Sequence, residues 1–214
     1  WIETDQYQLR RDFLPPHLAV ELKKMKIDGS LAVQSRQSLE ETRWLLQMAE
    51  KYPEILGVVG WVDLQSAACA AQLEEFSESK WMKGVRHVVQ VEPDPRFMLR
   101  KEFLEGIVQL KAHDLVYEIL IHENQLPMAV DFVSRFPDQP FVLDHMAKPK
   151  IQEQILQPWS KQIKKLAAFP NVSVKVSGMV TEADLKNWKP ADFKPYLEII
   201  FDAFGEERIL LGSD

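Results

Sequence analysis

Short apolar segments with strand character alternate along this chain with longer segments whose apolar residues recur at helical spacing. The apolar segments are rich in β-branched residues and end at polar or turn residues, as buried parallel strands do. The predicted strand segments are residues 31–37, 55–64, 84–90, 115–122, 140–149, 171–178 and 208–214. The predicted helices are residues 15–26, 38–52, 66–76, 101–113, 126–136, 158–169 and 191–205. This alternation predicts a parallel sheet that is covered by helices.

Two of the predicted helices carry local start signals. Proline occupies the first turn of the helix at 15–26, where its missing N–H costs nothing. Ser38 followed by Glu41 matches a capping box at the start of the next helix. Both signals support the order of elements read from the apolar pattern.

The number and order of the strands favour an α/β fold of the (β/α)8 TIM barrel class, in one domain over residues 1–214. The pattern begins with a helix and ends with a strand, so such a barrel would lack its first strand and its final helix. The chain starts at Trp1 without a methionine, and we expect it to be processed, clipped or partial. A doubly wound open sheet is the alternative, although no glycine-rich phosphate loop follows any predicted strand.

Composition and charge argue against some classes of binding partner. The chain has 214 residues, 46% of them hydrophobic, and a formal net charge of −6. Nucleic acids and anionic membranes attract basic proteins, so neither is expected to bind here. No apolar run reaches the length of a membrane span, and no signal peptide opens the sequence. The single cysteine, Cys69, rules out an internal disulfide and suits a cytoplasmic protein.

Polar and titratable side chains gather where the predicted strands end, which is where barrel enzymes carry their catalytic groups. These candidates are Gln34, Arg36, Asp63, Arg86, His87, Glu118, His122, Asp144, His145, Lys148, Lys175, Ser177 and Asp214. Side chains alternate along a strand, so Leu143 and His145 share one face and Asp144 points the other way. We therefore predict that His145 faces the pocket, and that Asp144 makes a supporting hydrogen bond or a contact with the helices.

The strand-end groups suit hydrolysis of an ester or an amide. An ionised Asp214 can act as general base on a water molecule or contact a metal-bound water. His145 can bind a divalent metal or stabilise a developing oxyanion. Arg86 offers a bidentate fork for a carboxylate or a polarised carbonyl, and Lys148 and Lys175 add positive charge.

Structural roles are equally open for several of these residues. Arg86 and Lys175 could pair with acidic residues between the barrel and the helix layer. Glu118 could be a buried, paired carboxylate, and His113 and His122 are more typical of loop or surface positions.

Five motifs of the chain resemble those of one known family. The segments WVDL, GVRHVVQ, FVLDHMAKP, VKVSG followed by TEAD, and the closing RILLGSD are similar to the amidohydrolase-2 branch of the amidohydrolase superfamily. Within that branch they look closest to the sugar-lactone hydrolases of the L-fuconolactonase and L-rhamnonolactonase types. The resemblance covers essentially the whole chain and implies a distorted (β/α)8 barrel that opens lactone rings of aldonic acids, sometimes with a bound divalent cation.

The resemblance also implies roles for individual residues. Asp214 matches the strand-8 aspartate, the general base, and His145 matches the strand-6 histidine, a metal ligand or an electrophilic catalyst. Arg86 and His87 match the strand-4 pair near the substrate. The His-x-His metal pair of strand 1 has no counterpart in this sequence, and strand 5 carries His122 near the place of the family's strand-5 metal histidine.

The leading hypothesis is a lactonase of carbohydrate metabolism. Asp214 would deprotonate the attacking water, and His145 would polarise the ring carbonyl, with or without a divalent metal. If a metal is bound, we expect zinc, with His145 and Asp214 as its ligands. The residues expected to bind substrate are Arg86, His87, Gln34, Lys148 and Trp188, the last by stacking on a sugar ring. We expect a small sugar lactone as the partner and leave a homo-oligomer open.

Two alternatives remain. The same barrel could be a metal-independent hydrolase or a decarboxylase that acts on a carboxylate-rich breakdown product. The chain could also be a catalytically incomplete barrel fragment, because a barrel without its first strand has two unpaired edges.

Overall fold

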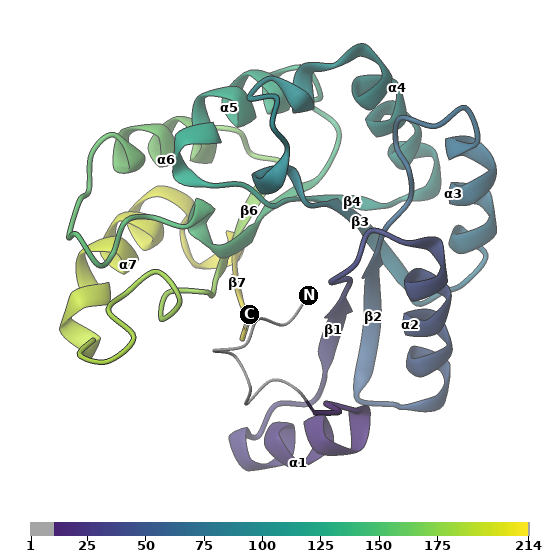
Figure 1. The fold of residues 1–214 in the computed structure, drawn as a ribbon, viewed down its shortest axis with the longest axis horizontal. Coiled ribbons are helices and arrows are strands. Elements are labelled where there is room, and N and C mark those ends of the chain that lie inside the picture. The colour runs from purple at the N-terminus through teal and green to yellow at the C-terminus, as the bar shows by residue number, and fades with distance from the viewer. Residues whose placement is uncertain (1–10, 214) are drawn as a thin grey trace.

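The computed structural model describes residues 11–213, and its centre is a curled sheet of parallel strands (Figure 1). The strands lie side by side in chain order. They are β1 Ser30–Val33, β2 Ile55–Gly60, β3 Met82–His87, β4 Val116–Ile119, β5 Phe141–Leu143, β6 Val172–Val176 and β7 Ile209–Leu211. Every neighbouring pair is parallel. The chain must therefore return to the other end of the sheet after each strand.

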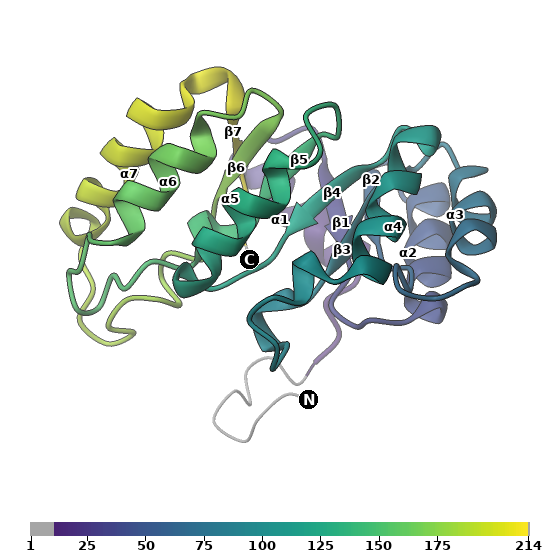
Figure 2. The same ribbon diagram turned by 90° about the horizontal axis from the view of Figure 1, so that it is seen from above.

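Helices make these return connections and lie along the outside of the curled sheet (Figures 1 and 2). They are α2 Leu39–Lys51, α3 Cys69–Ser77, α4 Lys101–Leu110, α5 Leu126–Ser134, α6 Trp159–Ala167 and α7 Pro190–Phe204. A further helix, α1 Pro15–Met25, precedes β1 and does not join two of the described strands. Short 3₁₀ segments cover Val89–Val91, Phe97–Leu99, Lys111–His113, Glu123–Gln125, Asp144–Ala147 and Glu206–Arg208. The predicted alternation of strands and helices is confirmed in full over the described residues.

The strands are shorter than the apolar segments that predicted them. The segment 115–122 contains β4, which pairs with β5 only as far as Ile119 opposite Leu143. Leu120 and Ile121 continue the apolar run and are buried, but they lie beyond the ladder. The ladder stops because β5 itself ends at Leu143, where the chain turns.

The predicted capping box of α2 is half formed. Ser38 adopts an extended backbone, and its hydroxyl accepts the backbone N–H of Glu41 at 3.1 Å. The Glu41 carboxylate does not return to Ser38. It accepts the backbone N–H groups of Ser35 at 3.2 Å and Arg36 at 2.6 Å. The start of α2 is therefore tied to the loop that follows β1.

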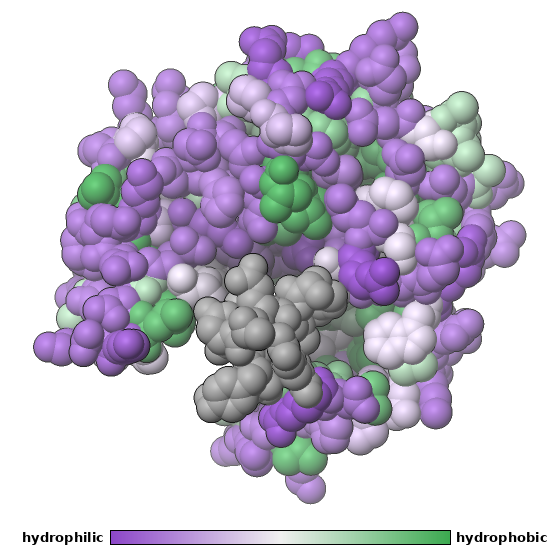
Figure 3. Space-filling view, viewed as in Figure 1, coloured by the Kyte–Doolittle hydropathy of each residue, from purple (hydrophilic) through white to green (hydrophobic). Residues whose placement is uncertain are grey.

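The surface is mostly polar in the view of Figure 3, with apolar side chains in separate patches. Scattered exposed apolar residues of this kind are ordinary for a folded protein. Among residues 11–213, no helix has the length and apolar character needed to cross a membrane.

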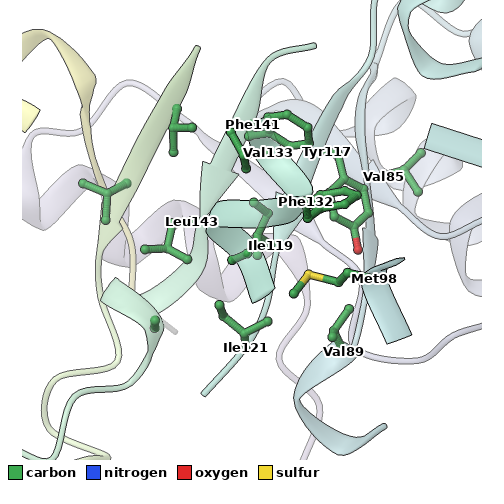
Figure 4. Close-up of a cluster of buried hydrophobic side chains, with 14 of the residues drawn as sticks. Val85, Val89, Met98, Tyr117, Ile119, Ile121, Phe132, Val133, Phe141 and Leu143 are labelled. Carbon is green, nitrogen blue, oxygen red and sulfur yellow. The ribbon is translucent and has the colours of Figure 1, made fainter. Parts of the chain in front are cut away.

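The main core lies between the sheet and the helices that cover it (Figure 4). Tyr117 of β4 and Phe141 of β5 pack against Phe132 of α5, with ring centroids 5.9 and 5.3 Å apart. Phe103 of α4 completes the cluster, 5.8 Å from Tyr117. Because side chains alternate along a strand, the residues next to Tyr117 in β4 and next to Phe141 in β5 point to the concave side of the sheet.

Truncation of Phe132 should be costly because its side chain is fully buried at the centre of this cluster. We expect Phe132→Ala to lower the free energy of unfolding by about 3–5 kcal/mol, through lost burial and the cavity left behind. Phe201→Ala is the matched control: Phe201 is 46% exposed on α7 and should cost far less. Urea unfolding of both variants measures the difference, and equal losses would contradict the assignment of the core.

Candidate active site

Four charged side chains meet at the carboxyl ends of β3 to β6. The Asp144 carboxylate pairs with Arg86 Nη1 at 2.9 Å and with Lys175 Nζ at 2.8 Å. Lys175 Nζ also pairs with Glu118 Oε1 at 2.6 Å. The Asp144 side chain is 0% exposed, Glu118 is 2% exposed, and both cations are 11% exposed. We call Arg86, Glu118, Asp144 and Lys175 the charge network.

Strand register explains why these residues meet. Arg86 lies opposite Glu118 in the β3–β4 ladder, and Glu118 lies opposite Val142 in the β4–β5 ladder. Tyr117, next to Glu118, faces the helices, and Val85, next to Arg86, lies opposite Tyr117 in the ladder. Arg86 and Glu118 therefore face the concave side.

The prediction that Asp144 points toward the helices is wrong in direction. Leu143 is the residue that packs into the core with Phe141, so Asp144 follows on the concave side. The prediction of a supporting hydrogen bond is confirmed, because Asp144 accepts one from Arg86 Nη1. The acid–base pairs foreseen for Arg86 and Lys175 also exist, but they lie within the concave face.

Gln34, predicted to bind substrate, is a fully buried partner of Arg86. Its side-chain Nε2 donates to the backbone carbonyl of Arg86 at 3.1 Å. In return, Arg86 Nη2 donates to the backbone carbonyl of Gln34. The guanidinium is thus held by the loop after β1 and by Asp144, and each terminal nitrogen already has one protein acceptor.

Burial changes the pKa of one member of the charge network, Glu118. It raises the pKa of Glu118 to about 7, and the negative charge of Asp144 acts in the same direction. Lys175 opposes the rise by pairing with the ionised carboxylate. With both carboxylates ionised the network is neutral, and protonation of Glu118 gives it one net positive charge.

His145 lies directly after Asp144, in a turn of left-handed backbone. Its side chain is 8% exposed, and its Nδ1 lies 2.8 Å from the hydroxyl oxygen of Ser177 at the end of β6. The backbone leaves the strand at Asp144, so strand alternation does not govern the direction of His145. The turn and Ser177 place the imidazole at the carboxyl edge of the sheet.

His87 lies on the other side of the sheet from its neighbour Arg86. Its ring stacks on Phe97 at 4.7 Å and meets Phe103 edge-on at 5.8 Å. Burial lowers the pKa of His87, while the hydrogen bond with Glu92, 2.7 Å from Nε2, acts against that change. Arg86 and His87, matched as a pair by the family resemblance, are therefore not brought together with one another.

The remaining predicted substrate contacts lie around the edge. Lys148 is partly buried at the end of the left-handed turn. Burial first, and then the charge of Lys148, lower the pKa of His122 on the neighbouring loop. Trp188, in the long loop between β6 and α7, is 40% exposed and packs against Phe193 at 5.3 Å. Asp214 lies outside the described residues.

The described residues do not make up a metal site by themselves. Among residues 11–213, no group of three His, Cys, Asp or Glu side chains is arranged to hold a metal ion. His145 is the one predicted ligand in this range, and its Nδ1 is engaged with Ser177.

Parallel strands in chain order, an outer layer of helices, and charged groups at the strand carboxyl ends define an enzyme of the α/β-barrel class. The amidohydrolase family profile matches residues 4–214. The chain belongs to the amidohydrolase family, as its strand-end motifs predicted.

Two curated relatives are similar over nearly the whole chain. The L-fucono-1,5-lactonase of Burkholderia multivorans is 37% identical over 224 residues, covering 100% of this chain and 75% of the relative. The L-fucono-1,5-lactonase of Burkholderia ambifaria is 34% identical, and the match covers 95% of this chain and 70% of the relative. A crystal structure of an amidohydrolase from Burkholderia multivorans with bound zinc has a TM-score of 0.95 at 36% identity, and covers 100% of this chain and 78% of that one. The predicted barrel fold class is confirmed.

The raised pKa of Glu118 predicts a pH dependence of stability. Between its ordinary value of 4.5 and about 7, the folded protein keeps a proton that the unfolded chain releases. The contribution of Glu118 to the free energy of unfolding therefore falls as pH rises through this window, by about 3 kcal/mol in all. The glutamine side chain of Glu118→Gln is neutral at every pH, so the variant should lack this pH-dependent contribution to the free energy of unfolding.

The measurement is urea unfolding of wild type and variant at pH 4.5 and pH 8. We expect Glu118→Gln to gain stability relative to wild type as pH rises. Glu198→Gln is the control, because Glu198 is exposed on α7. A stability difference between Glu118→Gln and wild type that is constant with pH would contradict the raised pKa.

Proposed function

We propose that this chain carries the active site of a hydrolase that opens the ring of a sugar lactone, the internal ester of an aldonic acid. The observation that carries the proposal is the 37% identity, across the whole chain, to a protein named L-fucono-1,5-lactonase. The chemistry of the site supports it, because an imidazole and two cations lie at the carboxyl edge of a barrel-type sheet.

Lactone hydrolysis needs an activated water and a place for negative charge on the carbonyl oxygen. Asp214 takes a proton from water as the water oxygen bonds to the carbonyl carbon. His145 stabilises the oxyanion that forms. Collapse of this intermediate breaks the bond to the ring oxygen, which leaves with a proton as a hydroxyl group. The proton that Asp214 took from the water goes to this ring oxygen, and the single product is the open-chain sugar acid, which carries both the new carboxyl group and the freed hydroxyl group.

The substrate-binding residues take two kinds of role in this proposal. Arg86, Lys148 and Trp188 contact the lactone, the first two through positive charge and the third by stacking on its ring. Gln34 is fully buried and acts by holding the guanidinium of Arg86. His87 supports the end of β3 from the helix side, where it packs on Phe97.

Loss of the base or of the oxyanion contact should greatly lower turnover without loss of the fold. We expect Asp214→Asn and His145→Asn each to lower kcat for L-fucono-1,5-lactone by about 100- to 10,000-fold. His113→Asn is the matched control: His113 follows α4 at the amino end of β4 and contacts Ser77 instead. A pH-indicator assay measures ring opening, and near-normal rates in the Asp214 variant would rule out its role as base.

A divalent ion is a separate part of the proposal. We expect zinc to be the ion and His145 and Asp214 to be the residues of this chain that contact it. Metal analysis of the purified protein should find zinc, and His145→Asn should contain less of it. Equal zinc in both proteins would exclude His145 as a ligand, and the role of His145 in ring opening would still be tested by the assay above.

A further inference from the structure

The turn that carries His145 has an unusual backbone. Its four residues His145, Met146, Ala147 and Lys148 have φ angles of 50, 53, 58 and 51°. This left-handed region favours glycine, and none of the four is glycine. Consecutive residues persist in such a conformation only when surrounding contacts hold them there. The contacts of this turn therefore decide where His145 lies.

One buried hydrogen bond holds the middle of the turn. The indole N–H of Trp159 donates to the backbone carbonyl of Met146 at 2.7 Å. Trp159 is 1% exposed, and Met146 and Ala147 are fully buried. The backbone N–H of Lys148 donates to the carbonyl of His145 at 2.8 Å and closes the turn. The Met146 carbonyl belongs to the Met146–Ala147 peptide, so the indole fixes the second peptide plane after the Cα of His145.

Trp159 is itself firmly placed. It is the first residue of α6, and its ring packs on Tyr196 of α7 at 5.4 Å. The Tyr196 hydroxyl donates to the backbone carbonyl of Lys150 at 3.0 Å, just beyond the turn. Helices α6 and α7 thus brace the turn from outside the sheet.

A second contact holds the imidazole from the opposite side. His145 Nδ1 lies 2.8 Å from Ser177 Oγ in a buried hydrogen bond. Gly212, after β7, leaves room for that hydroxyl, since a Cβ there would come within 3.3 Å of Ser177 Oγ. The ring is held between β6 and the braced turn, and the turn sets the position of its backbone.

We infer that Trp159 is a positioning residue, which orients His145 through the carbonyl of Met146 without touching the substrate. The inference rests on the proposed function, in which His145 stabilises the oxyanion. Without the indole N–H, the Met146 carbonyl is left buried and unpaired, and the turn loses the contact that favours its left-handed backbone. The imidazole then departs from the geometry that the oxyanion requires.

Trp159→Phe tests this with an aromatic ring retained and the N–H removed. We expect kcat for L-fucono-1,5-lactone to fall about 10- to 100-fold while KM changes by less than about two-fold. Trp81→Phe is the matched control, because Trp81 packs against the core at the amino end of β3 and should leave kcat unchanged. An unchanged kcat in a folded Trp159→Phe protein would overturn the inference.

A spectroscopic arm separates positioning from general loss of structure. The chain has five histidines, and the imidazole NMR signal that disappears in His145→Asn identifies His145. We expect that signal to shift in Trp159→Phe and to stay in place in Trp81→Phe. If Trp159→Phe does not fold, benzothienylalanine at position 159 keeps the ring shape with sulfur in place of N–H. A His145 signal that is unmoved by either replacement would refute the inference.

The two proposals can fail separately. Full activity of His145→Asn would remove the catalytic role of His145, and the NMR arm would still report whether Trp159 orients its ring. Loss of activity in His145→Asn, together with normal activity in Trp159→Phe, would leave the proposed function standing and reject Trp159 as its positioning residue.

Discussion

The buried carboxylate of Asp144 is the constraint on which the sheet and the site both depend. A charge with no exposed surface costs several kcal/mol to desolvate, so it needs opposite charges in direct contact. Asp144 has two, Arg86 from β3 and Lys175 from β6, with Glu118 of β4 on the far side of the lysine. Because a slip of one residue would turn a side chain to the other face, these pairs fix the register of the strands between β3 and β6.

The same network sets the electrical character of the carboxyl edge. Two cations and two carboxylates cancel, so the network does not strongly retain an anionic product. Glu118 is the group that can change this balance near neutral pH, because burial and Asp144 raise its pKa to about 7. The guanidinium of Arg86 is held by Asp144 and Gln34, and therefore presents its charge from a fixed position.

The sequence predicted the fold well because parallel strands that are buried on both faces give nearly continuous apolar segments between amphipathic helices. It also predicted the family, through motifs at the ends of β2, β3, β5, β6 and β7. The prediction that the Asp144 side chain points to the helices was wrong, because the apolar pattern does not say which alternate residues of the strand face the helices. Phe141 and Leu143 take that side by packing with the aromatic residues of α4 and α5. Glu118 and Lys175 appeared as separate candidates, since only the register shows that they share one partner network.

His145 lies at the carboxyl edge of the sheet, but strand alternation is not what puts it there. The strand ends at Leu143, and the chain then forms a left-handed turn. The turn contains no glycine, which is the usual sequence signal for this backbone conformation. A local sequence pattern cannot predict such a turn, because each of its four residues by itself favours a backbone conformation with negative φ. The turn exists because Trp159, on the following helix, reaches back to the Met146 carbonyl and Ser177 receives the imidazole. The position of the proposed electrophile is therefore a property of tertiary packing, and substitutions far along the chain from His145 can displace it.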